Sequence, residues 1–135
     1  MRVAVVIGAL AVLVLASAVP AATAPGAGTS LVITYVEDSA RPATAIRWTL
    51  RCDPPRGTHP RRSRVCRELA RVGWRAFSPV PPATACAELF GGPQVALVRG
   101  RVGGHAVWAR LSRADGCQIE RWSKVPSLLP AGGPT

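Results

Sequence analysis

Four cysteines that follow a predicted export signal limit the folds that this chain can adopt. A short basic start, Met1-Arg2, precedes an unbroken apolar run over residues 3–18, and small residues follow. This pattern is typical of a secretory signal peptide, because the apolar run is too short for a comfortable membrane span. We expect a signal peptide over residues 1–21, with cleavage after Ala18, Ala21 or Ala24. The remaining chain is long enough for one small domain with a thin core.

Export places the cysteines in an oxidising compartment, where two disulfides are the simplest state. The residues alone leave three pairings open among Cys52, Cys66, Cys86 and Cys117. The sequence has no Cys-x-x-Cys motif, and His59 and His105 lack the spacing of a zinc site, so we expect no metal and no other cofactor. Both histidines are expected to be exposed loop residues.

Basic residues dominate the charge of the chain. One arginine is lost with the signal peptide, which leaves 16 Lys and Arg residues against 7 Asp and Glu residues and a net charge near +9. Such a charge attracts anionic partners. However, the arginines are spread from Arg41 to Arg121, with one local cluster at residues 61–64 (Arg61, Arg62 and Arg64). We therefore expect a solvated basic surface, no nucleic-acid partner, and no membrane contact after signal cleavage.

Hydrophobic alternation predicts two strands at the start of the domain, over residues 31–36 and 45–52. The turn between them is expected at residues 37–42. The second strand would place three apolar side chains on the core face: Ile46, Trp48 and Leu50. Residues 53–60 contain three prolines and a glycine, which predicts an irregular loop.

A helix is predicted over residues 64–71. Ser63 could accept hydrogen bonds from its first amides, and Gly73 suits its C-terminal end. Three apolar residues recur at helical spacing and would form its buried face: Val65, Leu69 and Val72.

The second half of the domain begins with a proline-rich linker over residues 74–85. Strands are predicted over residues 94–99 and 105–111, joined by a glycine-bearing hairpin turn, and a final strand over residues 118–129. The pattern as a whole indicates an α+β domain of mainly antiparallel strands with at least one helix on one side.

The loop over residues 86–93 reads Cys-Ala-Glu-Leu-Phe-Gly-Gly-Pro and is the candidate functional segment. It lies between the proline-rich linker and a strand, which predicts an anchored, extended and exposed loop. Leu89 and Phe90 are then candidates for contact with a partner, because packing poorly explains apolar side chains on a loop. The alternative is that both side chains fill the local core.

Several sequence blocks together resemble the bacterial subtilisin inhibitor-like family of secreted serine-protease inhibitors. Arg56-Gly-Thr-His-Pro60 is the most specific block, and the others are Ser30-Leu-Val-Ile-Thr34, Thr49-Leu-Arg-Cys-Asp-Pro, Val65-Cys-Arg-Glu-Leu-Ala70 with Val72-Gly73, the 86–93 loop, and Val107 to Cys117. The blocks follow the order of the family and cover nearly the whole mature chain.

The resemblance implies disulfides between Cys52 and Cys66 and between Cys86 and Cys117. It also implies a five-stranded antiparallel sheet with two helices packed on one face, and a homodimer formed by sheet-to-sheet packing. The domain would cover residues 30–130, between a flexible N-terminus at 22–29 and a frayed tail at 131–135.

The same resemblance implies a substrate-like inhibitor with no catalytic residue of its own. Counted from Cys86, the family pattern places the scissile bond between Glu88 and Leu89, with Phe90 at an aromatic position. The protease-contacting loop would then also include Ala85, Cys86, Ala87, Phe90 and Gly91.

A second register is possible because the family's aspartate is replaced by Gly91 and Pro93 arrives one residue late. Counted back from Pro93, the scissile bond is Leu89–Phe90. Glutamate before the scissile bond indicates a glutamate-specific protease, whereas leucine suits subtilisin-like and chymotrypsin-like pockets. We favour the register counted from the cysteine, since the pair Gly91-Gly92 can absorb the extra residue. These two glycines would also loosen the loop.

Two other functions are compatible with the sequence. The chain could be an extracellular binding module that kept the scaffold and lost inhibition, or a basic protein that adheres to anionic polymers. An enzyme is not expected, because no paired carboxylates, nucleophile with a base, or phosphate-binding glycine loop is recognisable.

Overall fold

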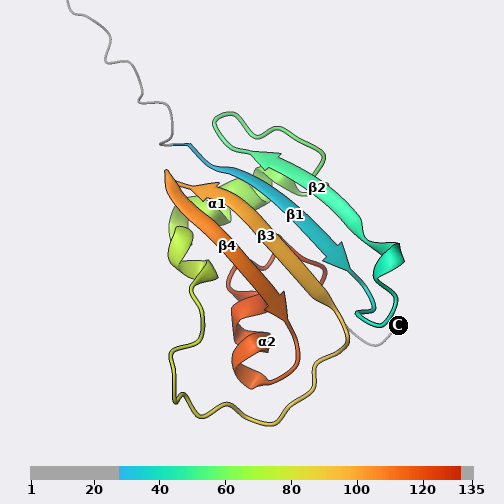
Figure 1. Cartoon of the computed structure of the whole chain (residues 1–135). Coiled ribbons are helices and arrows are strands. Elements are labelled where there is room, and N and C mark those ends of the chain that lie inside the picture. Colours follow the sequence, from blue (N-terminus) through green and yellow to red (C-terminus); the bar gives the residue numbers. More distant parts are fainter. Residues whose placement is uncertain (1–27, 132–135) are drawn as a thin grey trace, which may run out of the picture.

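The computed structural model describes residues 28–131 (Figure 1). The predicted signal peptide, most of the predicted flexible N-terminus and most of the predicted frayed tail lie outside these residues. Each helix among the described residues is too short or too polar to span a bilayer. The elements are, in chain order, β1 (Ser30–Val36), β2 (Ile46–Arg51), α1 (Arg62–Val72), β3 (Val95–Val102), β4 (His105–Ser112) and α2 (Gly116–Ser123), with short 3₁₀ turns η1 (Pro42–Thr44) and η2 (Trp74–Phe77).

The strands form one antiparallel sheet in the order β2-β1-β3-β4. Alternation along β1 explains its two faces, because Leu31, Ile33 and Tyr35 are all at most 2% exposed while the residues between them face away from the core. The predicted α+β class and the four strands at these positions are confirmed. The expectation of a five-stranded sheet is wrong for the described residues, which form four strands.

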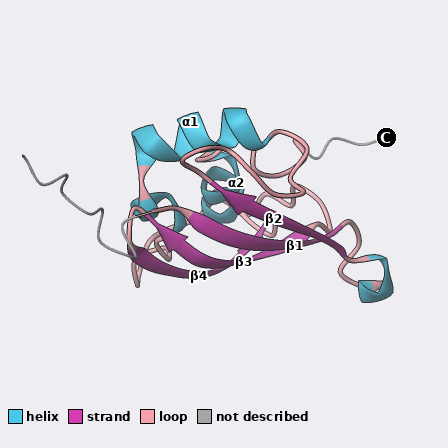
Figure 2. Cartoon of the chain, turned by 90° about the horizontal axis from the view of Figure 1, so that it is seen from above, coloured by secondary structure: helices cyan, strands magenta, loops and turns pink. Residues whose placement is uncertain are grey.

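Both helices pack on the same face of the sheet (Figure 2). Among residues 28–131, no segment covers the other face, which we call the open face. The core lies between the sheet and the helices and is built from apolar side chains that are almost fully buried, among them Leu31, Ile33, Leu50, Val65, Val98, Leu111, Leu128 and Leu129. Of the predicted core face of β2, Leu50 is buried, Trp48 packs against the core, and Ile46 at the strand end is 48% exposed.

The predicted strand at residues 118–129 is wrong, because α2 occupies the first part of this segment. The Asp115 carboxylate accepts a hydrogen bond from the Gln118 amide at 2.9 Å and thereby satisfies one of the free amides at the helix start. Trp122 is 5% exposed and faces the core. Asp115 and Gly116 therefore begin a helix and do not lead into a strand.

Helix α1 agrees with its prediction at the C-terminal end, where Gly73 adopts φ 67°. Val65 and Leu69 are buried as expected, but Val72 is 43% exposed. Ser63 does not cap this helix, because the helix already begins at Arg62. His59 supplies an acceptor here instead, since its Nδ1 accepts a hydrogen bond from the Arg61 amide at 3.1 Å.

His59 is therefore a structural residue, and its predicted exposure is wrong. It is 1% exposed, lies edge-on to Trp48 with ring centroids 5.2 Å apart, and donates from Nε2 to the Leu128 carbonyl at 2.9 Å. Both ring nitrogens of the neutral imidazole therefore form hydrogen bonds, Nε2 as a donor and Nδ1 as an acceptor. The other histidine, His105, is exposed as predicted and stacks on Trp74.

A buried glutamate also joins α1 to the C-terminal segment. Burial opposes the ionised form of Glu68, but the amide and hydroxyl of Ser127, at 2.9 and 2.7 Å, and the nearby Arg64 hold its pKa below the usual value. The segment after α2 is therefore tied to α1 by polar as well as apolar contacts.

Candidate functional site

The two disulfides join Cys52 to Cys66 and Cys86 to Cys117, which confirms the pairing implied by the family resemblance. The first links the end of β2 to α1. The second links the candidate loop to the first turn of α2, with the two Cα atoms 5.3 Å apart. The loop itself runs around α2 toward the start of β3 and has no regular secondary structure from residue 84 to residue 92 (Figure 1).

The central side chains of the loop are exposed. Leu89 is 59% exposed and Phe90 is 74% exposed, and Glu88 is exposed beside them. The alternative interpretation, in which Leu89 and Phe90 fill the local core, is therefore wrong. All the sequence-predicted site residues, from Ala85 to Gly91, lie on this one continuous segment.

Backbone hydrogen bonds hold the loop on both sides of its exposed centre. The Ala87 carbonyl accepts from the Gly116 amide at 2.9 Å, and the Gly91 amide donates to the Arg113 carbonyl at 2.7 Å. Arg113 lies in the turn between β4 and α2, and Gly116 is the first residue of α2. The Leu89 amide donates to the Ala87 carbonyl at 2.8 Å, so the bend between these residues is also defined.

The hydrogen bonds of the loop leave the backbone groups of two residues unpaired among the described residues. Ala87 and Gly91 bond to the scaffold and Leu89 bonds back to Ala87, whereas the amides and carbonyls of Glu88 and Phe90 make no hydrogen bond within residues 28–131. The backbone of Glu88 and Phe90 is therefore free to pair with another chain.

The two glycines after Phe90 occupy positions that larger residues would not fit. A Cβ on Gly91 would lie 2.9 Å from Ile119 Cδ1 of α2. Gly92 adopts φ 138°, and a Cβ there would lie 2.3 Å from Gln94 Oε1. The sequence predicts a loosening effect of this pair, but the backbone here is held closely against the scaffold.

A polar network supports the end of the loop. Gln94 accepts from Arg113 at 3.2 Å and donates to Glu37 at 3.1 Å. The Tyr35 hydroxyl also donates to Glu37, and these two hydrogen bonds hold the pKa of Glu37 below its usual value. The Ser39 amide donates to the Pro93 carbonyl, so the turn after β1 also holds the loop.

Arg121 of α2 holds the segment that leads into the loop. Its guanidinium donates to the Ser78 carbonyl at 2.9 Å and to the Phe77 carbonyl at 3.4 Å, and burial lowers its pKa. Sequence reasoning missed the roles of Arg121, Arg113 and Gly116. The available signal was Asp115 as a helix cap, because a helix that begins there places Gly116 beside Ala87 and Arg121 beside Ser78.

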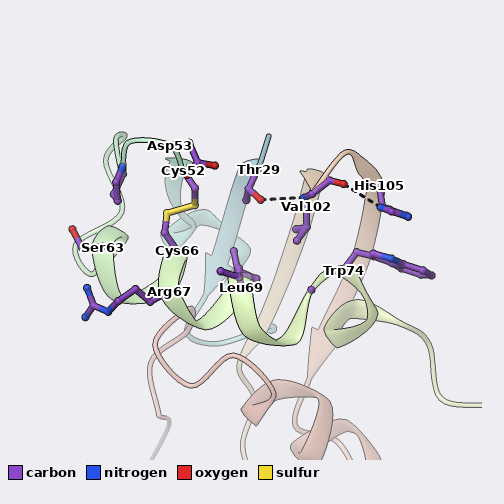
Figure 3. Close-up of a pocket in the computed structure, with 14 residues that line it drawn as sticks. Thr29, Cys52, Asp53, Ser63, Cys66, Arg67, Leu69, Trp74, Val102 and His105 are labelled. Atoms are coloured by element: carbon purple, nitrogen blue, oxygen red, sulfur yellow. Dashed lines mark hydrogen bonds between the residues drawn. A yellow bond between two sulfur atoms is a disulfide. The ribbon is translucent and has the colours of Figure 1, made fainter. Parts of the chain in front are cut away.

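One further side-chain cluster and one larger hollow lie within residues 28–131. The sulfurs of Cys86 and Cys117 lie near Asp115, but they are bonded to each other and cannot act as thiolate ligands. A pocket of about 550 Å³ lies between α1 and the strand ends, beside the Cys52–Cys66 disulfide and Trp74 (Figure 3). None of the residues predicted for the protease-contacting loop lines it.

Comparison with known proteins gives one family match. A sequence model of the family described as subtilisin inhibitor-like matches residues 27–110, which include β1 to β3, most of β4 and the whole candidate loop. A search of curated proteins gave no match.

Proposed function

Because this chain belongs to the subtilisin inhibitor-like family, we propose that it is a secreted inhibitor of serine endopeptidases that acts through the loop Cys86–Pro93. The observation that carries this proposal is the exposed peptide Glu88-Leu89-Phe90 between backbone bonds to the scaffold and next to a disulfide. Such a loop offers a cuttable bond in a held conformation. No catalytic side chain of the inhibitor is required.

In the proposed mechanism, the loop enters the protease cleft and pairs with it as an added strand. The protease serine adds to the scissile carbonyl carbon, and cleavage would release an amine. The bonds at Ala87 and Gly91 flank the scissile bond, so the new amine stays beside the acyl-enzyme and can reform the peptide. Resealing then competes with escape of the cut ends.

We place the scissile bond between Glu88 and Leu89. Strand addition needs backbone groups that are not already bonded, and alternate residues of an added strand face the partner. The unbonded residues Glu88 and Phe90 satisfy this condition in the register counted from Cys86. In the other register the residues facing the protease would include Ala87, whose carbonyl already accepts two hydrogen bonds.

Affinity in this proposal comes mainly from preorganisation. A flexible peptide loses conformational freedom when a protease binds it, whereas the held loop has lost that freedom on folding. Glu88 would place a carboxylate in the specificity pocket, which is favourable only where that pocket offers cationic or hydrogen-bonding groups. The partners are therefore secreted serine proteases, with a glutamate-specific enzyme first and subtilisin-like or chymotrypsin-like enzymes after it.

The test is a titration of subtilisin, chymotrypsin, trypsin and a glutamate-specific protease with the mature protein. Residual activity reports inhibition, and mass spectrometry reports cleavage of the loop. We expect stoichiometric inhibition of at least one enzyme with slow cleavage at Glu88–Leu89. Rapid cleavage by every enzyme, or no complex with any of them on gel filtration, would support a binding module that has lost inhibition. The homodimer implied by the family resemblance stays a prediction.

A further inference from the structure

Arginines lie on both layers of this domain. Those of the strands are exposed, alternate with core residues and point to the open face: Arg47, Arg51, Arg99, Arg101 and Arg110. The homodimer implied by the family resemblance would cover that face. A second set lies on the helix layer, on the other side of the sheet (Figure 2). We call this set the arginine ridge, and its members are Arg61, Arg62, Arg64, Arg67 and Arg71.

The arginine ridge follows the exposed side of α1. Arg64, Arg67 and Arg71 are three and four residues apart, so they share one side of the helix. The buried apolar residues of α1 lie on the other side, against the core. All five ridge arginines are exposed, and residues 61–71 span about 15 Å along the helix axis. The ridge therefore carries one positive charge about every 4 Å.

Only one carboxylate belongs to α1, and it lies beneath the ridge. Glu68 is 5% exposed, and its Oε1 is 3.4 Å from Nε of Arg64. The other ridge arginines make no ion pair within residues 28–131. Asp53 borders the same pocket as Arg67 but forms no ion pair with it. The ridge therefore keeps most of its positive charge.

A hollow of about 310 Å³ lies at the end of the ridge where α1 begins. Four of the five ridge arginines line it together with Pro60 and Ser63, and only Arg71 lies outside it. The Arg61 guanidinium is held at its edge, because it donates to the Leu129 carbonyl at 3.0 Å. Several cations around one hollow repel one another, so an anion placed among them is favourable.

We propose that the arginine ridge binds a linear polyphosphate chain, with phosphate oxygens on the ridge guanidinium groups and in the hollow. A guanidinium donates two parallel hydrogen bonds to the oxygens of one phosphate. Every unit of a phosphate chain carries a negative charge, which matches the close spacing of the ridge charges. The candidate loop passes below α2, away from α1, so the proposal is independent of protease inhibition (Figure 1). It also leaves the open face available to a second copy.

Other anionic partners fit the ridge less well. A carboxylate has two oxygens in one plane and pairs with one guanidinium in bidentate geometry, whereas four guanidinium groups border the hollow. Nucleic-acid bases need an aromatic ring to stack on, but the nearby Trp74 already stacks with His105 and lies under Arg75. Docking on an anionic membrane also needs projecting apolar side chains, and Val72 is the one large apolar residue of α1 that is exposed.

The test is fluorescence anisotropy of an end-labelled inorganic polyphosphate with the mature protein at several salt concentrations. The double variant R67Q/R71Q removes two ridge charges and keeps helix propensity, because glutamine and arginine are similar helix formers. R41Q/K124Q removes the same charge at exposed positions outside the ridge. We expect R67Q/R71Q to weaken binding about tenfold or more and to reduce the slope of log K against log salt by about 1.4, whereas R41Q/K124Q changes affinity less than about threefold.

R67K/R71K separates the effect of charge from general damage to the helix. Because lysine keeps the charge but not the guanidinium fork, we expect this variant to bind at least about threefold more tightly than R67Q/R71Q. Circular dichroism and thermal unfolding verify that each variant is folded.

Competition identifies the chemistry of the partner. Unlabelled polyphosphate should displace the probe at a lower concentration than polyglutamate or oligothymidylate of equal total charge. Absence of binding by the unmodified protein, equal losses in R67Q/R71Q and R41Q/K124Q, no recovery in R67K/R71K, equal or better competition by polyglutamate or oligothymidylate, or preferential binding to anionic lipid vesicles would each overturn the proposal.

Discussion

The backbone carbonyl of Ala87 accepts a hydrogen bond of 2.9 Å from the amide of Gly116, the residue that precedes Cys117. Because Cys86 is bonded to Cys117, two consecutive loop residues are attached to two consecutive residues at the start of α2. A loop held at one residue can rotate about that point, whereas attachment at two adjacent residues sets the direction in which the loop continues. The orientation of Glu88 thus depends on the position of α2.

The position of the scissile bond is tested by introducing arginine at each candidate residue. We expect Glu88→Arg to confer inhibition of trypsin, with an inhibition constant at least tenfold lower than that of the unmodified protein, a change of about 1.4 kcal/mol. Leu89→Arg should confer none. The measurement is a trypsin titration of both variants. A gain of inhibition from Leu89→Arg alone would assign the bond to Leu89–Phe90.

In the proposed mechanism, removal of the loop disulfide makes the loop an ordinary protease substrate. We expect C86S/C117S to lose roughly 3–4 kcal/mol of unfolding free energy in the chain-entropy model, and to be cleaved rapidly even where it remains folded. C52S/C66S is the matched control, because it loses roughly 3 kcal/mol without touching the loop. Denaturant unfolding and cleavage rates measure the two effects. Equal cleavage rates in the two variants would show that rigidity of the loop does not depend on Cys86–Cys117.

Gly92 is expected to be required for inhibition. Gly92→Ala would put a Cβ at φ 138°, 2.3 Å from Gln94 Oε1, and should cost about 1–3 kcal/mol and weaken inhibition at least tenfold. Gly103 also has positive φ, at 55°, but a Cβ there meets nothing within 4 Å. Gly103→Ala should therefore lower stability without affecting inhibition. Inhibition constants and thermal unfolding of both variants distinguish loop geometry from general destabilisation.

Stability should fall as the pH is lowered through the titration range of His59. Burial holds the pKa of His59 below its usual value, and a proton on Nδ1 would displace the Arg61 amide. As the pH falls, His59 in the unfolded chain therefore binds a proton at a higher pH than His59 in the folded chain. The full stability is present above about pH 6.5 and is lost progressively below it. Urea unfolding at pH 7.5 and pH 5.5 measures this change.

The control for the pH experiment is the exposed histidine. His105→Gln should keep the pH dependence, whereas His59→Gln should remove it and also lower stability at pH 7.5, because its buried contacts with Leu128 and Arg61 change. A flat stability profile of the unmodified protein between these pH values would contradict the prediction.

Prediction from sequence succeeded where the signal was local. Alternation identified the strands, helical spacing identified α1, and the proline-rich approach and apolar residues identified the exposed loop. The same reasoning failed at residues 118–129. Aspartate followed by glycine is found both in turns and at the start of helices, so the local sequence did not show that Asp115 caps a helix. It also failed for His59, because nothing beside it in sequence shows that Trp48 and Leu128 enclose it.

The disulfide-bonded class, the α+β pattern and the identity of the loop residues could be predicted from the amino-acid sequence, because they follow from residue type and spacing. Which backbone groups of the loop are bonded and which stay free depends on the fold, since the bonding partners at Arg113 and Gly116 lie in another part of the chain. The fold likewise brings five dispersed arginines onto one face of the sheet. Hydrogen-bond pairing and strand register join residues that are distant in sequence, and no single segment encodes either of them.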